Sequence, residues 1–284
     1  MKILFAVITS AIILFIIIFF KDVLKNREKI RSENGSVIYY LIAEFTVWFA
    51  ATFGISDSAL NTIALRHKVC VPLDILPGTF VVGSAIPISV IGLGYVNTYP
   101  ADMKAALIMM SAGAAGAFTG AAFAVKINGK AIKNIMAVLL MATAVCLIVK
   151  YIITKGADGT AVNLIGLQLV AVTIIAFISA GLAMVGFGAT APIISVMMIM
   201  GIATTTIMPM VMCMCSMISF TGSVEFIKSG RYHRKAAVCE VIAGTAGAIA
   251  ALQFIQNINT FILQIIMIGV ILYSSISLIA DRRN

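Results

Sequence analysis

The sequence predicts an all-α, polytopic membrane protein with an inverted-topology internal repeat and broken or re-entrant helices. Its composition excludes an ordinary soluble domain, because 61% of the residues are hydrophobic and only 11% are charged. The apolar residues form long runs without a period of two, so we expect helices and not barrel strands in the bilayer. A third observation, a duplicated stretch of sequence, indicates two copies of one membrane unit.

Seven apolar runs are long enough to span, or nearly span, a bilayer: residues 3–20, 75–95, 105–125, 135–151, 163–185, 206–220 and 260–279. The first run resembles the core of a signal peptide. No small-residue cleavage site follows it, so we interpret it as a retained span. The expected organisation is an N-terminal span and cytoplasmic loop (1–36), a first membrane repeat (37–155) and a second membrane repeat (156–284), all within one integral membrane domain.

The duplication is clearest after two lysines. Lys104 begins the pattern KAA, five residues, AGAAGA, and Lys235 begins KAA, five residues, AGTAGA. Upstream of each copy, a glycine that breaks a helix and a proline inside an apolar run recur 132 residues apart: Gly54 and Gly186, Pro77 and Pro209. Small residues on one helix face allow two backbones to approach closely, so we expect the glycines of each copy to hold their own repeat together.

The basic residues predict the orientation of the spans. Sixteen of the twenty Lys and Arg residues lie in five clusters, and the positive-inside rule places these clusters in the cytoplasm. Residues 36–65 must then leave the cytoplasmic side and return within about 45 Å of helix, whereas two full crossings need about 60 Å. We therefore expect a helix at 37–53, a break at 54–58 and a short return helix at 57–65.

The second repeat has the same pattern in the opposite direction. A span at 163–185 is expected to break at 186–188, and a short helix follows at 191–200. Further spans are expected at 203–226, 235–254 and 260–280. Each repeat then has five segments, and an odd number gives the two copies opposite orientations. A break is also expected at Pro77-Gly78-Thr79, near the cytoplasmic end of its span.

Two helix breaks in equivalent places are the best indication of a transporter site, because unwound backbone at membrane depth must face protein or a water-filled cavity. The N-termini of the short helices suit an anion. Thr190 is expected to cap the second of them. The predicted substrate-binding residues are Gly54, Ser56, Ser58, Asn61, Gly78, Thr79, Gly186, Gly188, Thr190 and Thr206.

Three acidic residues lie in or beside these spans. Asp57 either caps its own helix or binds a coupling ion, a proton or Na⁺, and we name it as the ion-coupling residue. Glu44 and Glu240 are expected to pair with Arg66, Lys104 or Lys235, or to serve a proton pathway.

A soft-metal transporter is the alternative function. Residues 208–217 contain Met and Cys at helical spacing, and thioether and thiolate ligands select Cu(I). Met is also an ordinary filler between helices, and the sequence has no external Met or His cluster to load copper. We expect no enzymatic activity, no resident metal and no cofactor, because the chain has no GxSxG, HExxH or paired acidic motif.

These motifs resemble the TauE/SafE sulfite-exporter permeases over about residues 37–279. Gly54, Gly186 and Gly188 match the family's Gly-rich break, and Gly78-Thr79 matches its GT. Gly116-Ala117 and Gly247-Ala248 match its GxxGA element. The chain departs from the pattern with Ser56-Asp57-Ser58 and Gly188-Ala189-Thr190 at the GGG core, and with Pro209-Met210-Val211 at the second GTS position.

The resemblance implies sulfite, organosulfonates or related small anions as substrates. We therefore expect a secondary transporter that moves a small anion by alternating access across the cell membrane of a bacterium. The expected partners are the anion and the lipid bilayer, without nucleic acid, and a homo-oligomer is left open.

Overall fold

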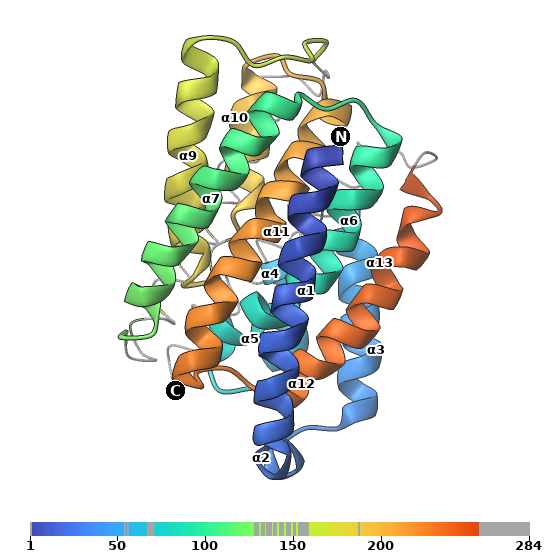
Figure 1. Cartoon of the computed structure of the whole chain (residues 1–284), viewed down its shortest axis with the longest axis vertical. Helices are drawn as coiled ribbons and strands as arrows, with labels where there is room; N and C mark the ends of the chain where they lie inside the picture. Colours follow the sequence, from blue (N-terminus) through green and yellow to red (C-terminus); the bar gives the residue numbers. More distant parts are fainter. Residues whose placement is uncertain are drawn as a thin grey trace.

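A computed structural model describes residues 2–53, 55, 57–66, 71–127, 159–186 and 188–255, with seven further residues between 131 and 152. These residues form a helical bundle (Figure 1). Its helices are α1 (Lys2–Lys25), α2 (Arg27–Ser32), α3 (Val37–Ala51), α4 (Asp57–Arg66), α5 (Leu76–Gly83), α6 (Ala85–Thr98), α7 (Met103–Ala124), α9 (Leu167–Ala183), α10 (Thr190–Ile199), α11 (Thr204–Ser229), α12 (Arg234–Cys239), a π-helical turn η1 (Glu240–Gly244) and α13 (Thr245–Leu252).

The fold is that of a membrane-embedded protein. Within the described chain, α1, α7, α11 and the continuous helix Arg234–Leu252 are long and apolar enough to cross a bilayer. The bent pair of α5 and α6 adds a fifth such span if it is counted as one. The predicted spans at 135–151 and 260–280 lie outside the described residues, apart from isolated positions in the first.

Helix α11 is the centre of the bundle. It packs against α7, α6, α1, α5 and α10, and most of its side chains are buried (Figure 1). Its partner α5–α6 runs antiparallel to it, because contacts on α11 move back along the chain as those on α5–α6 move forward. Ser223 bonds to the Val81 carbonyl, Ser216 bonds to the Ile88 carbonyl, and Gly92 packs on the Cys213 backbone.

The break in this partner span differs from the predicted one. Helices α5 and α6 meet at Ser84 with a bend of 44°, and Pro77 instead lies in the first turn of α5. Proline is tolerated there because the first N–H groups of a helix have no intrahelical acceptor. The bend lies one turn before Pro87, whose missing N–H leaves the Gly83 carbonyl without its usual partner.

Each short helix returns to the end of the bundle where its hairpin began. The Tyr39 hydroxyl, near the start of α3, donates to the Ala64 carbonyl near the end of α4. After α10, the Ile202 segment pairs with Ala161, which precedes α9. The helices predicted at 37–53, 57–65, 163–185 and 191–200 therefore correspond to α3, α4, α9 and α10.

The duplicated glycines form close helix contacts, although not inside the predicted repeats. A Cβ at Gly116 on α7 would collide with the Phe177 carbonyl oxygen of α9, and one at Gly247 on α13 would collide with the Phe45 carbonyl oxygen of α3. Each glycine thus packs against the opposite predicted repeat. The expectation that they hold their own repeat together was wrong.

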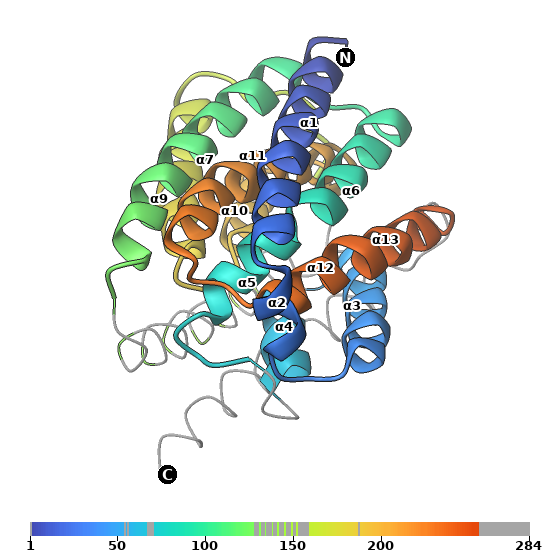
Figure 2. The same cartoon turned by 60° about the horizontal axis from the view of Figure 1, so that its bottom comes forward.

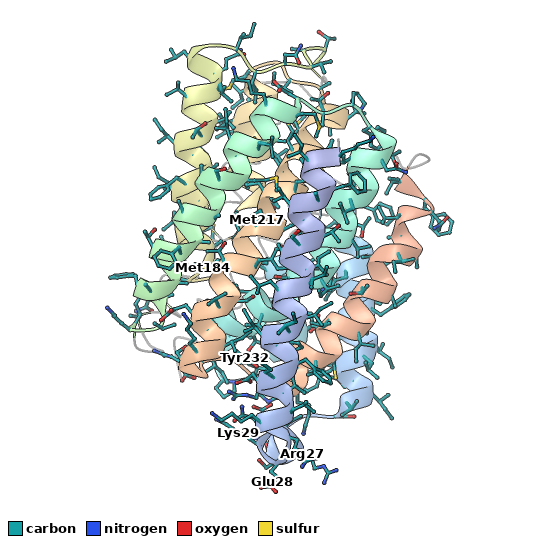
Figure 3. All side chains as sticks on the ribbon, viewed as in Figure 1. Arg27, Glu28, Lys29, Met184, Met217 and Tyr232 are labelled. Carbon is teal, nitrogen blue, oxygen red and sulfur yellow. The ribbon has the colours of Figure 1, made fainter. Side chains whose placement is uncertain are left out.

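The two ends of the bundle collect different loops. At one end, visible in Figure 2, the last turn of α1 meets the α11–α12 loop. Asp22 accepts hydrogen bonds from Tyr232 at 2.6 Å and Arg234 at 2.7 Å, and Tyr232 lies beside α1 above the charged α2 (Figure 3). At the other end, Asp102 caps α7 and also accepts from the Leu164 N–H at 3.1 Å.

Candidate functional site

A cavity of about 60 Å³ lies inside the bundle, where several helices begin, end or bend. One water needs about 10–15 Å³ by this kind of measure, so the cavity has room for a few heavy atoms. Its lining comes from α4, α5–α6, α9, α10 and α11. The lining residues are Asp57, Ser58, Phe80, Val81, Ser84, Ile88, Ala183, Met184, Gly186, Gly188, Ala189, Thr190, Cys215, Ile218 and Ser219.

Two helix N-termini meet at this cavity. Helix α4 begins with Asp57 and Ser58, and α10 begins with Thr190; all three residues line the cavity. The first turn of each helix has backbone N–H groups without intrahelical acceptors and the positive end of the helix dipole. Both features attract negative charge. The Asp57 carboxylate already provides some of this negative charge within the protein, because it accepts a hydrogen bond from the Ser58 N–H.

The approach to α10 depends on a glycine. Gly186 has a φ of +95°, a left-handed conformation that residues with a side chain rarely adopt. This turn ends α9 and brings Gly188 and Ala189 to the cavity wall. Thr190 is the first residue of α10 rather than its cap, since Ala189 holds the cap position without a side-chain hydrogen bond. The Thr190 hydroxyl therefore does not form the predicted N-cap.

The opposite wall supplies hydroxyl groups. Ser84 at the bend and Ser219 on α11 share a hydrogen bond of 2.9 Å, and both line the cavity. Ser219 also accepts the Ser223 hydroxyl at its carbonyl oxygen, which fixes this turn of α11. Sequence reasoning missed Ser84 and Ser219. Pro87 could have revealed the first of them, since a proline predicts a bend about one turn earlier.

Five of the predicted site residues line this cavity: Asp57, Ser58, Gly186, Gly188 and Thr190. Others do not line it. Thr79 bonds to the Ile75 carbonyl and accepts the His233 N–H, and Gly78 packs on Arg231 and Phe226.

Two further predicted residues also lie elsewhere. Asn61 is buried against Glu240, and Thr206 is buried near the start of α11. Gly54 and Ser56 are outside the described residues, so their predicted roles stay predictions.

The buried acids lie differently from expectation. Glu240 accepts hydrogen bonds from the Trp48 indole at 3.1 Å and the Asn61 amide at 3.3 Å, and the titratable groups that act on it are Glu44 and Asp57. The predicted pairing with Lys235 is wrong, because that ammonium group donates to the Glu33 carbonyl. In the described part of the chain, neither Glu44 nor Glu240 forms an ion pair with a cation.

Sulfur-containing side chains lie in the cavity wall and in the core next to it. Cys215 and Met184 contribute to the lining, and the other Met and Cys side chains of α11 pack in the core or beside it. Among the described residues, no group of three or more His, Cys, Asp or Glu is arranged to hold a metal ion.

Comparison with known proteins adds no relative: no family model, curated protein or solved structure matches this chain. The class defined by the fold is therefore an all-helical membrane protein with a small cavity between its helices, lined by apolar groups and a few polar ones.

Proposed function

We propose that this protein is a secondary transporter that moves a small anion across a membrane, with the cavity between α4 and α10 as its binding site. One observation carries the proposal: two ten-residue helices, far apart in the sequence, begin at the same cavity. The paired N-termini provide N–H donors and positive dipole ends for an anion. Ser58, Ser84 and Thr190 add hydroxyl donors to the lining.

An inverted repeat would explain why the two hairpins approach from opposite ends. Three contacts support it. Helices α5–α6 and α11, which occupy equivalent places, pack antiparallel. The glycine contacts also match, since Gly116 meets Phe177 and Gly247 meets Phe45. These glycines are 131 residues apart and the phenylalanines 132 apart, the same offsets as in the duplicated sequence.

Such an arrangement suits alternating access. The α3–α4 hairpin reaches the cavity from one end of the bundle and the α9–α10 hairpin reaches it from the other. Movement of either hairpin against the α5–α6 bend would open the cavity to one side and leave it closed to the other.

The substrate class we propose is sulfite or a small organosulfonate. The resemblance of Gly186, Gly188 and the two GxxGA stretches to the TauE/SafE permeases supports it, and so does the small size of the cavity. A tetrahedral or pyramidal oxyanion presents several acceptor oxygens, which match the N–H and hydroxyl donors around the lining.

A soft-metal transporter is the second candidate. Cys215 and Met184 line the same cavity, and both sulfur atoms would suit Cu(I). Stabilisation of the purified protein by Cu(I), lost in Cys215→Ser and absent with oxyanions, would favour this function over anion transport.

The first test uses Thr190→Val, which keeps the shape of the side chain and removes its hydroxyl. We expect sulfite to bind the purified protein and the variant to bind it about ten- to a hundredfold more weakly, the value of one lost hydrogen bond to a charged ligand. Calorimetric titration at constant ionic strength, with methanesulfonate and chloride in parallel, measures both affinities. Thr173→Val is the matched control, because Thr173 bonds within α9 and does not line the cavity.

Equal affinity in wild type and Thr190→Val would remove α10 from the site. If sulfite, methanesulfonate and the other anions all fail to bind, the proposed substrate class is wrong.

A second test addresses Asp57. If its carboxylate carries the coupling ion, Asp57→Asn in proteoliposomes should bind substrate but lose the pH or Na⁺ dependence of uptake. If Asp57 only caps α4, asparagine caps nearly as well and uptake should stay close to normal. Uptake measured with and without each ion gradient separates these two roles.

A further inference from the structure

Behind the cavity wall lies a second polar site. Glu44 and Glu240 are fully buried, and Glu44 has no hydrogen-bond partner for either carboxylate oxygen in the described chain. Oε2 of Glu240 and Oδ1 of Asn61 are also unpartnered. An unpartnered buried polar group destabilises a protein, and a charged one does so more strongly, so four such oxygen atoms indicate a site suited to a proton or a cation.

The local structure brings the two carboxyl groups toward each other. Glu44 and Trp48 are four residues apart and lie on the same face of α3, and the Trp48 indole donates to Glu240. Helix α3 also packs along the π-helical turn η1, which brings the element that holds Glu44 against the element that holds Glu240. Glu240 begins the π-helical turn η1, an irregularity that often marks functional sites in helices.

Space for the Glu240 carboxyl group is made by a glycine. A Cβ at Gly83 would collide with Oε2 of Glu240, so the last residue of α5 has no side chain where this oxygen lies. Gly83 immediately precedes Ser84, which lines the cavity at the α5–α6 bend. The Glu240 carboxyl group and the cavity therefore both lie beside the α5–α6 bend.

We propose that Glu44 and Glu240 form a proton-binding site in which the two carboxyl groups share one proton. Two buried carboxylates without a cation repel each other, and one shared proton removes that repulsion, as in carboxyl dyads generally. It also gives an unpartnered oxygen a hydrogen-bond donor. The other titratable groups within electrostatic range of this pair are Asp57, which acts on Glu240, and Cys239, on which Glu44 and Lys235 act.

One hydrogen bond connects this proton to a helix that lines the cavity. Asn61, which donates to Glu240, lies one turn after Asp57 on the same face of α4. Loss of the proton gives Glu240 a negative charge, and a charged acceptor holds the Asn61 amide more strongly than a neutral one. Proton binding therefore changes the strength of the hydrogen bond between Glu240 and α4, the helix whose first turn lines the cavity. This coupling rests on the proposed transport function, whereas the proton site itself does not.

The chain contains its own reporter of this site. Trp48 is its single tryptophan and donates its indole N–H to Glu240. In the purified full-length protein we expect the fluorescence of Trp48 to follow one pH transition as the proton leaves. Glu240→Gln should abolish the transition. Glu44→Gln should move its midpoint to lower pH by about one pH unit or more, because the repelling neighbour is gone.

Three comparisons make the experiment decisive. Glu225→Gln, a change in a half-buried glutamate on α11, should leave the transition unchanged. A flat response in the wild type, or a transition that persists in Glu240→Gln, overturns the proposal. A midpoint that follows the sodium concentration at constant ionic strength overturns it in favour of a Na⁺ site.

Infrared spectroscopy covers the case in which Glu240→Gln does not fold. A protonated carboxyl group has a carbonyl band that ionised carboxylates lack. We expect this band in the wild type below the fluorescence midpoint, and we expect it to disappear above that midpoint. A wild-type band that does not decrease across the fluorescence midpoint overturns the proton site. Because neither measurement needs a substrate, failure of sulfite to bind would not be confused with failure of this site.

Discussion

His233 links several parts of the bundle at the end that contains α2. Its ring Nδ1 accepts the Ala236 N–H at 3.2 Å and caps α12, and its backbone N–H donates to the Thr79 hydroxyl. Glu33 lies 3.4 Å from the same ring nitrogen. Burial lowers the pKa of His233, although the nearby Glu33 carboxylate opposes this and Lys235 adds to it. The neutral ring is therefore the form that the fold selects.

This selection predicts a loss of stability in acid. The pKa of His233 is lower in the folded state than in the unfolded state, where it is about 6.5. The contribution of this histidine to the free energy of unfolding is therefore complete above about pH 6.5 and is lost as the pH falls through the folded-state pKa. His233→Asn keeps a cap acceptor and removes the titration. We expect the wild type to lose about 1 kcal/mol more than the variant between about pH 7.5 and pH 5.5.

Melting curves in detergent at the two pH values measure this difference. The Glu33 carboxylate gains an ion pair when His233 is protonated, so it reduces the effect. An identical acid shift in the wild type and His233→Asn would contradict the assignment of the loss to this histidine.

At the scale of helices, sequence reasoning succeeded where a local rule applied. Charge placement and helix length predicted that α4 returns to the end where α3 begins, and the Tyr39 contact with Ala64 agrees with that geometry. Sequence reasoning failed for the bend between α5 and α6, because it placed the break at Pro77 without considering that this proline lies in the first turn of a helix. In the first turn proline is harmless, while Pro87 displaces the hydrogen bonds one turn before it.

The close contacts of α7 with α9, and of α13 with α3, predict matched effects of two substitutions. Gly116→Leu and Gly247→Leu each place a branched side chain where a neighbouring backbone carbonyl lies. Overpacking of this kind destabilises by about 1–3 kcal/mol. Ala115→Leu and Ala246→Leu are the controls, because these neighbouring residues are exposed on the same helices. Chemical unfolding should show destabilisation of both glycine variants and little change in either control.

At the scale of the whole molecule, the sequence predicted the two short helices that begin at the candidate cavity but not the helices that enclose it. The glycine breaks and the N-termini of α4 and α10 are local features that a sequence can reveal. Ser84, Ser219 and Cys215 join them through the packing of α5–α6 against α11, which depends on long-range contacts. The proposed proton pair of Glu44 and Glu240 also depends on long-range packing, because 196 positions separate these residues in the chain.

The placement of loops at two opposite ends gives the last prediction. Lys29, Lys126 and Lys228 are exposed at the end where Asp22 meets Arg234, and Asn97 and Val162 are exposed at the end where Asp102 meets Leu164. The positive-inside rule predicts that the first end is cytoplasmic. Single cysteines introduced in a cysteine-free background should therefore react with an impermeant maleimide in whole cells only at positions 97 and 162. Positions 29, 126 and 228 should react only after the membrane is permeabilised. Labelling of positions 29 and 97 from the same side would show that the two ends of the bundle do not lie on opposite sides of the membrane. Labelling of only positions 29, 126 and 228 in whole cells would show that the orientation is the reverse of the predicted one.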